Sequence, residues 1–256
     1  MRSTPRKSKN TLFVTHGDNC TKLFSSDGTI TACTVLELCS NQEEADTRML
    51  LHSNHASQNG HQHIAIRSSD TDVEVLACYY QAVIAADITL ISGTKRISRI
   101  VSIRQAWEKL GREICEVLPS LHAITGCDSV SAFSTKGKKK GLDIVQLNPA
   151  LRQIVSSFGE RFPPNEEDLT KMEGFVCALY NDPSCNDVNE LRYKLFYKSK
   201  NLQSHQLPPT KEALTYMDHL KRANYHAFLW KHALETQTNQ APDGHGWQMK
   251  EGQLEI

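Results

Sequence analysis

Apolar residues recur with two different periods along the chain, and each period predicts a different kind of element. Alternating or short continuous apolar runs predict strands, and apolar residues three or four positions apart predict helices. Up to residue 145 the expected order is short strands or a hairpin over 11–38, a helix over 40–57, a strand over 63–70, a helix or strand-to-helix transition over 71–84, a strand over 87–92, and helices over 102–110 and 112–125. Strands that alternate with helices predict an α/β sheet in parallel order.

The helix expected over 40–57 carries its own start signals. Ser40 or Asn41 can cap it, and the acidic residues that follow suit the positive end of a helix dipole. Ala45, Met49 and His52 would then lie on one face.

After about residue 145 every apolar run has helical spacing, which predicts helices over 148–159, 165–181, 188–200 and 210–235. We therefore expect four parts in the chain. These are a basic lead with partial strands (1–34), an α/β domain (35–145), a helical region (146–235) and a loose tail rich in Gly, Gln and Pro (236–256).

Composition and charge leave the choice of partner open. The chain has 256 residues, and its 29 lysines and arginines balance 29 aspartates and glutamates, so only local charge can guide an argument. The longest apolar stretch, Val73 to Ile91, carries Glu74, Gln81 and Asp87 and is a poor membrane span. The basic first residues have no apolar run behind them, so we expect no secretory signal. Eight cysteines without a C-x-x-C pair indicate an intracellular, reducing setting without disulfides.

Acidic residues occur at three places where predicted elements begin or end. In an α/β sheet, ligands bind beyond the carboxyl ends of the strands. Carboxylates gathered there would repel one another unless a cation bound them, and hard oxygen ligands suit Mg²⁺ or Mn²⁺. Two such ions form the usual apparatus for phosphodiester hydrolysis. Helix capping and loop chemistry are the alternative explanation of each acidic place taken alone. The acids are Glu43, Glu44 and Asp46, then Asp70 and Asp72, then Asp128.

A basic glycine loop follows Asp128. Glycine allows close approach to a phosphate, and lysines with a helix N-terminus supply positive potential. A solvated lysine loop is the alternative reading, and the spacing excludes a Walker A loop. The candidate phosphate-binding residues are Lys136, Gly137, Lys138, Lys139 and Lys140.

The order of these motifs resembles the flap endonuclease and excision-repair nuclease family, the structure-specific 5′ nucleases of the PIN-like superfamily. That family has an "EAEA" helix start, an acidic "D-x-D" after a strand, and a "GCDY…GIGPKKAL" segment. The similar segments here are "EEADTRMLL", "SSDTDVEVL" and "GCDSVSAFSTKGKKKGLDIV", within about residues 35–145. The resemblance implies a PIN-like core that binds and cleaves nucleic acid, most readily DNA, in an intracellular and nuclear setting. Its catalytic metal ligands would be Glu44, Asp46, Asp70, Asp72 and Asp128.

Two features depart from that family. Residues 1–40 offer Asp18 and Asp27, and neither sits at a matching strand end, so we expect a nuclease core that is incomplete at its N-terminal side. The "GIG" turn is also reduced to one glycine. The segment "LHAITGCDSVSAFSTKGKK" resembles a group of animal genomic proteins, some of them tied to mobile elements. The expected fold is therefore an α/β, PIN-like parallel-sheet core followed by a helical C-terminal region.

Several alternatives stay open at this point. The first is a divalent-metal-dependent nuclease, and the second is a catalytically inactive PIN-like module that binds nucleic acid or protein. Four clustered histidines also offer a transition-metal site, although packing is the commoner use of such residues. They are His52, His55, His61 and His63. A basic and aromatic helix face would suit nucleic acid or simple amphipathic packing. It contains Arg192, Lys194, Lys198 and Lys200 among Tyr193, Phe196 and Tyr197.

Overall fold

A computed structural model describes residues 11–26, 29–42, 44–93, 98–198, 203–216, 219–235, 248–250 and 253–255. The expected basic lead over 1–10 and most of the tail from 236 lie outside these ranges, as does Glu43. Within the tail, strands β7 (Gln248–Lys250) and β8 (Gln253–Glu255) pair with each other.

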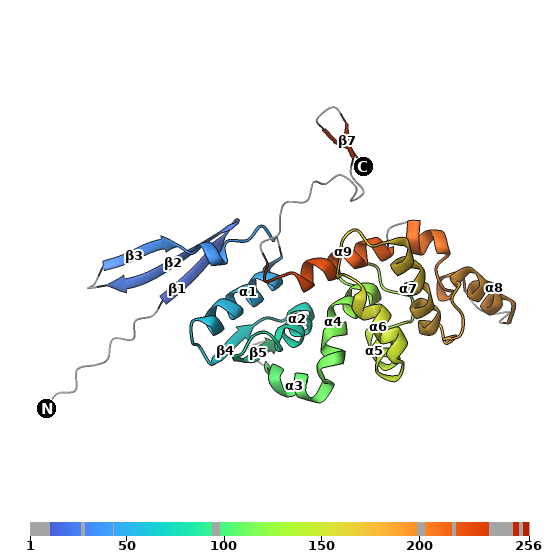
Figure 1. Ribbon diagram of the computed structural model, residues 1–256, viewed down its shortest axis with the longest axis horizontal. Coiled ribbons are helices and arrows are strands. Elements are labelled where there is room, and N and C mark those ends of the chain that lie inside the picture. Colours follow the sequence, from blue (N-terminus) through green and yellow to red (C-terminus); the bar gives the residue numbers. More distant parts are fainter. Residues whose placement is uncertain are drawn as a thin grey trace.

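The first sheet is an antiparallel meander of β1 (Thr11–His16), β2 (Asn19–Ser26) and β3 (Thr29–Thr34). This confirms the strands expected in the first 38 residues. The meander stands off the body of the molecule (Figure 1), and every residue of β3 is exposed.

Arg48 joins the meander to the body of the protein. The Arg48 side chain donates hydrogen bonds to the carbonyl oxygens of Gly17 at 2.5 Å, Ser40 at 2.6 Å and Gln42 at 2.7 Å. Gly17 lies in the turn between β1 and β2, so one guanidinium binds that turn and the segment that leads into the first long helix.

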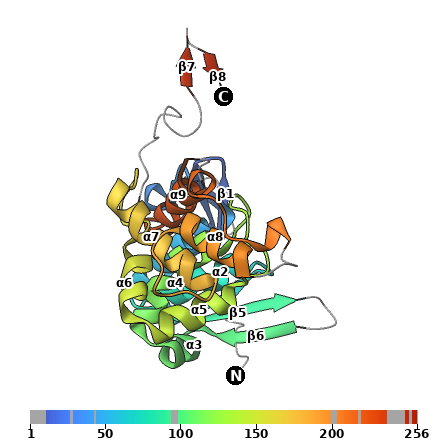
Figure 2. The same cartoon turned by 90° about the vertical axis from the view of Figure 1, so that its right-hand side faces the viewer.

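The second sheet is mixed, with the strand order β4 (His63–Arg67), β5 (Asp87–Gly93), β6 (Ser98–Ser102). β4 and β5 are parallel, as predicted, with His63 opposite Asp87. β6 runs antiparallel to β5, so the expectation of a wholly parallel sheet is wrong. β5 and β6 project beyond the helices as an arm (Figure 2).

Most of the helices lie close to their predicted ranges. The helices are α1 (Ala45–Gln58), α2 (Thr71–Tyr80), α3 (Ile103–Leu110), α4 (Arg112–Thr125), α5 (Lys138–Leu147), α6 (Pro149–Ser157), α7 (Glu166–Leu179), α8 (Val188–Lys198) and α9 (His219–Lys231), with short helical turns at Leu36–Leu38, Ser204–Gln206 and Glu212–Tyr216. Helix α5 had no predicted range, and α9 begins only at His219 within the helix expected over 210–235. Asp70, Ser102, Asn148 and Asn165 cap four of these helices with side-chain hydrogen bonds.

The start of α1 differs from the prediction. Its N-cap is Glu44, in extended conformation, and not Ser40 or Asn41. Ser40 instead accepts a hydrogen bond from the backbone N–H of Gln42 at 3.2 Å. The later start places Asp46 in the first turn of the helix.

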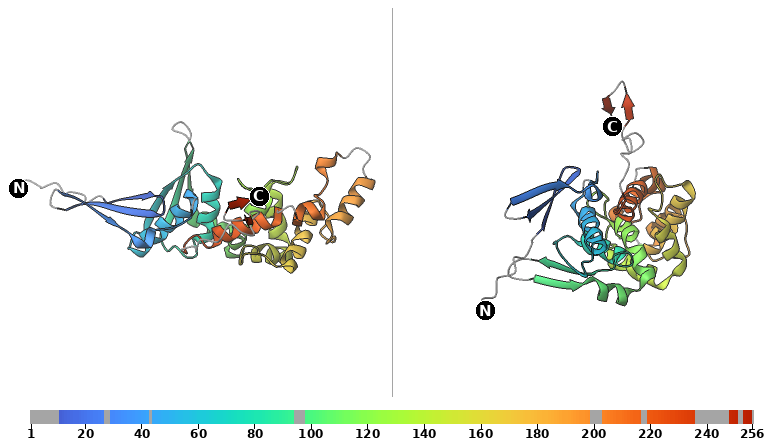
Figure 3. Two further views of the ribbon diagram at one scale, coloured as in Figure 1. Left: turned by 90° about the horizontal axis from the view of Figure 1, so that it is seen from above. Right: turned by 60° about the vertical axis from the view of Figure 1, so that its left-hand side comes forward.

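One buried core runs through both the α/β part and the helical part. It extends from Leu50 to Ala233 without a break at residue 145, and α9 packs against α4. The Tyr80 hydroxyl in α2 donates to the carbonyl of Trp230 at 2.7 Å and accepts from the N–H of Ala233 at 2.9 Å. The meander and the second sheet lie on one side of this body and the helices α5 to α8 on the other (Figure 3).

Candidate metal centre

Two helix N-termini bring three predicted aspartates together. Asp46 lies in the first turn of α1, Asp70 is the N-cap of α2, and Asp72 lies in the first turn of α2. One carboxylate oxygen from each lies within 4.8 Å of the other two. The positive ends of both helix dipoles face this cluster and offset part of the repulsion among its charges. These three side chains can hold one metal ion.

The capping explanation of Asp70 is confirmed. Its Oδ1 accepts a hydrogen bond from the backbone N–H of Asp72 at 3.0 Å. One oxygen of Asp70 therefore caps α2. Its second oxygen and the remaining lone pairs are available to a cation.

Asp46 carries the strongest electrostatic signal in the cluster. Burial, together with the charges of Asp70, Asp72, Glu44 and Asp128, raises the pKa of Asp46 from 3.8 to about 6. All five carboxylates predicted from the sequence are therefore close enough to interact. Uncompensated repulsion of this kind favours a proton or a bound cation at the cluster.

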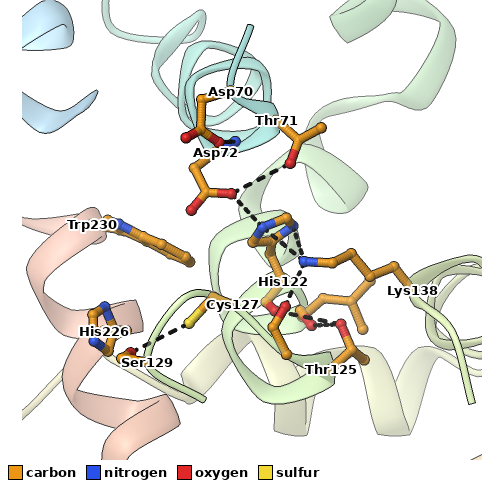
Figure 4. Close-up of polar contacts among 12 residues, drawn as sticks. Asp70, Thr71, Asp72, His122, Thr125, Cys127, Ser129, Lys138, His226 and Trp230 are labelled. Atoms are coloured by element: carbon orange, nitrogen blue, oxygen red, sulfur yellow. Dashed lines mark hydrogen bonds and ion pairs between the residues drawn. The ribbon is translucent and has the colours of Figure 1, made fainter. Parts of the chain in front are cut away.

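Asp72 differs from Asp46 because it has a histidine partner. His122 Nε2 lies 2.7 Å from Asp72 Oδ1, and Lys138 Nζ lies 2.8 Å from His122 Nε2 and 3.0 Å from His122 Nδ1 (Figure 4). The chain of bonds is satisfied when the ring proton sits on Nε2 and points at Asp72. Burial would raise the pKa of Asp72, but His122 and Lys138 outweigh it and hold that pKa below its ordinary value.

Lys138 is directed toward the acids. Its Nζ also donates to the carbonyl of Gly126 at 2.6 Å. Burial lowers the pKa of Lys138, while Asp72, Asp128 and Asp70 act in the opposite direction. Lys138 thus brings a positive charge close to the acids, in contact with His122 and in the first turn of α5.

A pocket of about 480 Å³, called the metal pocket below, opens beside Asp70 and Asp72. Its far wall is the turn after α4, where Cys127 and Val130 form an isolated bridge and Asp128 is exposed. Gly126 starts that turn with a φ of 117°, and a Cβ there would lie 2.8 Å from Cα of Ala132. Asp128 therefore lines the same pocket as Asp70 and Asp72, on a turn that requires glycine at position 126.

Three residues of the site escaped prediction from sequence. His122 is only 6% exposed and lies inside α4. Trp230 Nε1 donates to Glu44 Oε2 at 2.8 Å, and His226 Nδ1 lies 3.5 Å from Glu44 Oε1. Burial lowers the pKa of His226, although Glu44, Asp72 and Asp128 act to raise it. The spacing of His226 and Trp230, four apart on α9, was the available signal, since such residues share a helix face.

The predicted lysine loop is placed at a helix start, as expected, but its side chains have different partners. Gly137 is the N-cap of α5, and the three lysines that follow form its first turn. Lys136 lies over the ring of Tyr180, 5.0 Å from its centroid, and Lys140 Nζ donates to Asn181 Oδ1 at 2.5 Å. Lys138 is the member of this loop that lines the metal pocket.

The four clustered histidines are not brought together as a metal site. His52 Nε2 lies 2.9 Å from Thr15 Oγ1, and the rings of His52 and His55 pack against Phe13 of β1. Among the described residues, the aspartate cluster is the group with metal-binding geometry.

Comparison with known proteins assigns no relative to the chain: no family model matches it, and neither does any curated protein or solved structure. Across the described ranges, every helix is too short or too polar to cross a membrane.

Proposed function

We propose that this protein is a divalent-metal-dependent nuclease that hydrolyses phosphodiester bonds in nucleic acid. The observation that carries the proposal is the convergence of Asp46, Asp70 and Asp72, from segments 24 residues apart, on one set of close oxygen atoms. Carboxylates alone are the donor set of Mg²⁺ and Mn²⁺, whereas zinc favours nitrogen and sulfur. The PIN-like character of the core belongs to the same proposal.

Two ions would need more ligands than three aspartates, and two acidic side chains are available nearby. Glu44 precedes α1 and is held by Trp230, and Asp128 is on the opposite rim of the metal pocket. Divalent cations held by these carboxylates would supply an activated water and charge stabilisation for the leaving oxygen.

The chain's own residues have separate tasks in this proposal. His122 donates to Asp72 and so keeps that carboxylate ionised and oriented, as partners of metal ligands commonly do. Lys138 supplies the positive charge that a phosphate would meet beside the acids. Asp46, whose pKa is about 6, is the carboxylate most responsive to cation binding.

The first experiment is a thermal-shift titration with Mn²⁺ on the parent chain and on Asp72→Asn and Asp70→Asn. At ~100 times its dissociation constant, the ion should stabilise the parent by about 2.7 kcal/mol. Both variants should lose most of this stabilisation, because each removes one of three ligands. Asp143→Asn is the matched control, since Asp143 is exposed on α5, outside the cluster. Unchanged Mn²⁺ stabilisation in Asp70→Asn and Asp72→Asn would refute the metal centre.

Cleavage of labelled single-stranded and duplex oligonucleotides in Mn²⁺ then tests catalysis. Activity should be present in the parent and in Asp143→Asn and lost in Asp72→Asn. Mn²⁺ binding without cleavage of any of these substrates would refute the nuclease and leave the binding module as the better description.

Lys138 and its neighbour Lys139 form a matched pair for the role of positive charge. Lys138→Met should tighten Mn²⁺ binding about threefold to tenfold, because a cation beside the acids is removed, and should slow cleavage. Lys139 is exposed and lies outside the metal pocket, so Lys139→Met should leave Mn²⁺ affinity unchanged. Equal Mn²⁺ affinities in the two variants would contradict the assigned role of Lys138.

A further inference from the structure

Two more pockets continue from the metal pocket toward the far end of the molecule. Ala132 lines both the metal pocket and a second one of about 400 Å³, called the middle pocket. Arg192, Ser204 and Leu207 line both the middle pocket and a third of about 420 Å³, called the α8 pocket. The three pockets therefore adjoin one another in the order metal, middle, α8.

The charge of the lining residues differs among the three pockets. The metal pocket contains Asp70, Asp72 and Asp128, whereas the described residues that line the middle and α8 pockets include no aspartate or glutamate. Arg192 borders both of these pockets, and its guanidinium is held by the carbonyl of Pro208 at 2.5 Å. A path that is acidic at one end and free of carboxylates beyond it suits a polyanion that meets metal ions at that end.

The middle pocket has an aromatic wall with a cation behind it. Tyr180 lines this pocket, and Lys136 lies over the Tyr180 ring. Lys136 therefore places a second positive charge next to the middle pocket, in addition to that of Arg192.

The α8 pocket ends in exposed aromatic rings. Tyr193 and Phe196 line it and are 69% and 65% exposed, and Tyr197 beside them is 80% exposed. The rings of Tyr193 and Tyr197 stack with an interplanar angle of 21°. Three large rings left in solvent on one helix are unusual for surface residues without a partner.

We infer that the middle and α8 pockets bind the single-stranded part of a nucleic acid whose phosphodiester bond lies at the metal centre. Rings exposed in this way stack on bases that are free on both faces, which a single strand offers and a duplex does not. Arg192, which lines both pockets, then lies beside the phosphates between the stacked bases and the acids, and Lys136 adds positive charge next to the middle pocket. This inference rests on the proposed function for the reaction, but binding can be tested without it.

The test is fluorescence anisotropy with labelled oligodeoxythymidylate and oligouridylate, in EDTA so that no cleavage occurs. Tyr193→Leu and Phe196→Leu keep apolar bulk and helix propensity but remove the ring. Each should weaken binding about tenfold, which is typical of the loss of one stacked base. Tyr193→Phe and Phe196→Tyr keep the ring and should bind like the parent. Leu147→Ala, at an 85% exposed residue of α5, controls for general loss of surface apolarity.

Each outcome of this experiment either supports the single-strand path or overturns it. Weaker binding in the leucine variants, with retention in the ring-preserving variants, supports the single-strand path, and preference for one oligonucleotide shows whether the path favours a DNA or an RNA strand. Equal binding by all variants, or duplex bound as tightly as single strand, overturns it. No binding of either oligonucleotide also overturns it and leaves these rings as a protein-docking surface. Single-strand binding without cleavage would refute the nuclease proposal alone.

Discussion

Asp46 and Asp72 belong to one carboxylate cluster, yet their environments shift their pKa values in opposite directions. Burial and four neighbouring carboxylates raise the pKa of Asp46 to about 6. Burial acts on Asp72 in the same sense, but the hydrogen bond from His122 and the charge of Lys138 hold its pKa below the ordinary value. The cluster therefore has one carboxylate that stays ionised and another that gains or loses a proton in a mildly acidic range.

We predict that Asp46 makes the metal-free protein less stable as the pH rises toward 6. The pKa of Asp46 is about 6 in the folded state and near 3.8 when the chain is unfolded, so the folded chain keeps a proton that the unfolded chain has released. The stabilisation from that proton is complete below pH 3.8 and is lost as the pH rises through 6. The measurement is the free energy of unfolding across this range for the parent and Asp46→Asn.

Asp46→Asn, which has no proton to lose, should become more stable relative to the parent as the pH rises. Mn²⁺ should remove this difference at neutral pH by stabilising the parent. Parallel pH profiles of the two proteins without metal would contradict the raised pKa of Asp46.

At the residue scale, the sequence predicts the acids of the site but not their partners. Asp70 and Asp72 stand out because two carboxylates follow a strand, and in the structure both lie at the start of α2, shortly after β4. His122 and Trp230 look like ordinary residues of amphipathic helices, since nothing in a helical period tells which buried side chain meets an acid from another segment. Their roles arise from the packing of α4 and α9 against each other.

At the scale of elements, the turn after α4 depends on one glycine. We predict that Gly126→Ala destabilises the protein by about 1–3 kcal/mol, because the new Cβ would meet Ala132 at 2.8 Å and the φ of 117° is unfavourable for alanine. Urea unfolding measures this change. Mn²⁺ affinity should fall as well, because the same turn carries Asp128 and the carbonyl that binds Lys138.

Gly137→Ser is the matched control for that substitution. A Cβ at Gly137 meets nothing within 4 Å, and its φ of −81° suits any residue. Serine is also a good N-cap, so the stability of this variant should equal or exceed that of the parent. If Gly137→Ser lost as much stability as Gly126→Ala, the change measured for Gly126→Ala could not be assigned to the turn after α4.

Most elements could be predicted from apolar periodicity, and β6 is an instructive exception. Its five residues lie in a basic segment without a clear alternating pattern, because β6 is an edge strand with little buried surface. Arg99 in β6 forms a two-point ion pair with Glu74 of α2 at 2.9 Å, a contact between elements that no local pattern reveals. The mixed character of the sheet follows from this strand.

At the scale of the whole molecule, the shared core predicts a single unfolding transition. Tyr80 is the clearest test, because its buried hydroxyl bonds to two backbone groups of the C-terminal helix end. Tyr80→Phe should lower the free energy of unfolding by about 1–3 kcal/mol, since the N–H of Ala233 loses its acceptor. Urea titration followed by circular dichroism should show the entire transition shifting.

Its neighbour provides the control. Tyr79 is half-buried on the same helix, so Tyr79→Phe should change stability much less. Two separate transitions, of which one alone responds to Tyr80→Phe, would indicate that the α/β part and the helical part fold independently.

The meander β1–β3 has little share in that core, since β3 is exposed along its whole length and Leu12 and Ile30 face solvent. Opening this sheet exposes little additional apolar surface, and its amide protons can therefore exchange with solvent while the core stays closed. We therefore expect the meander to have a lower local stability than the shared core. Arg48 binds both Gly17 and the segment before α1, and so connects the meander to the part of the protein that contains the core.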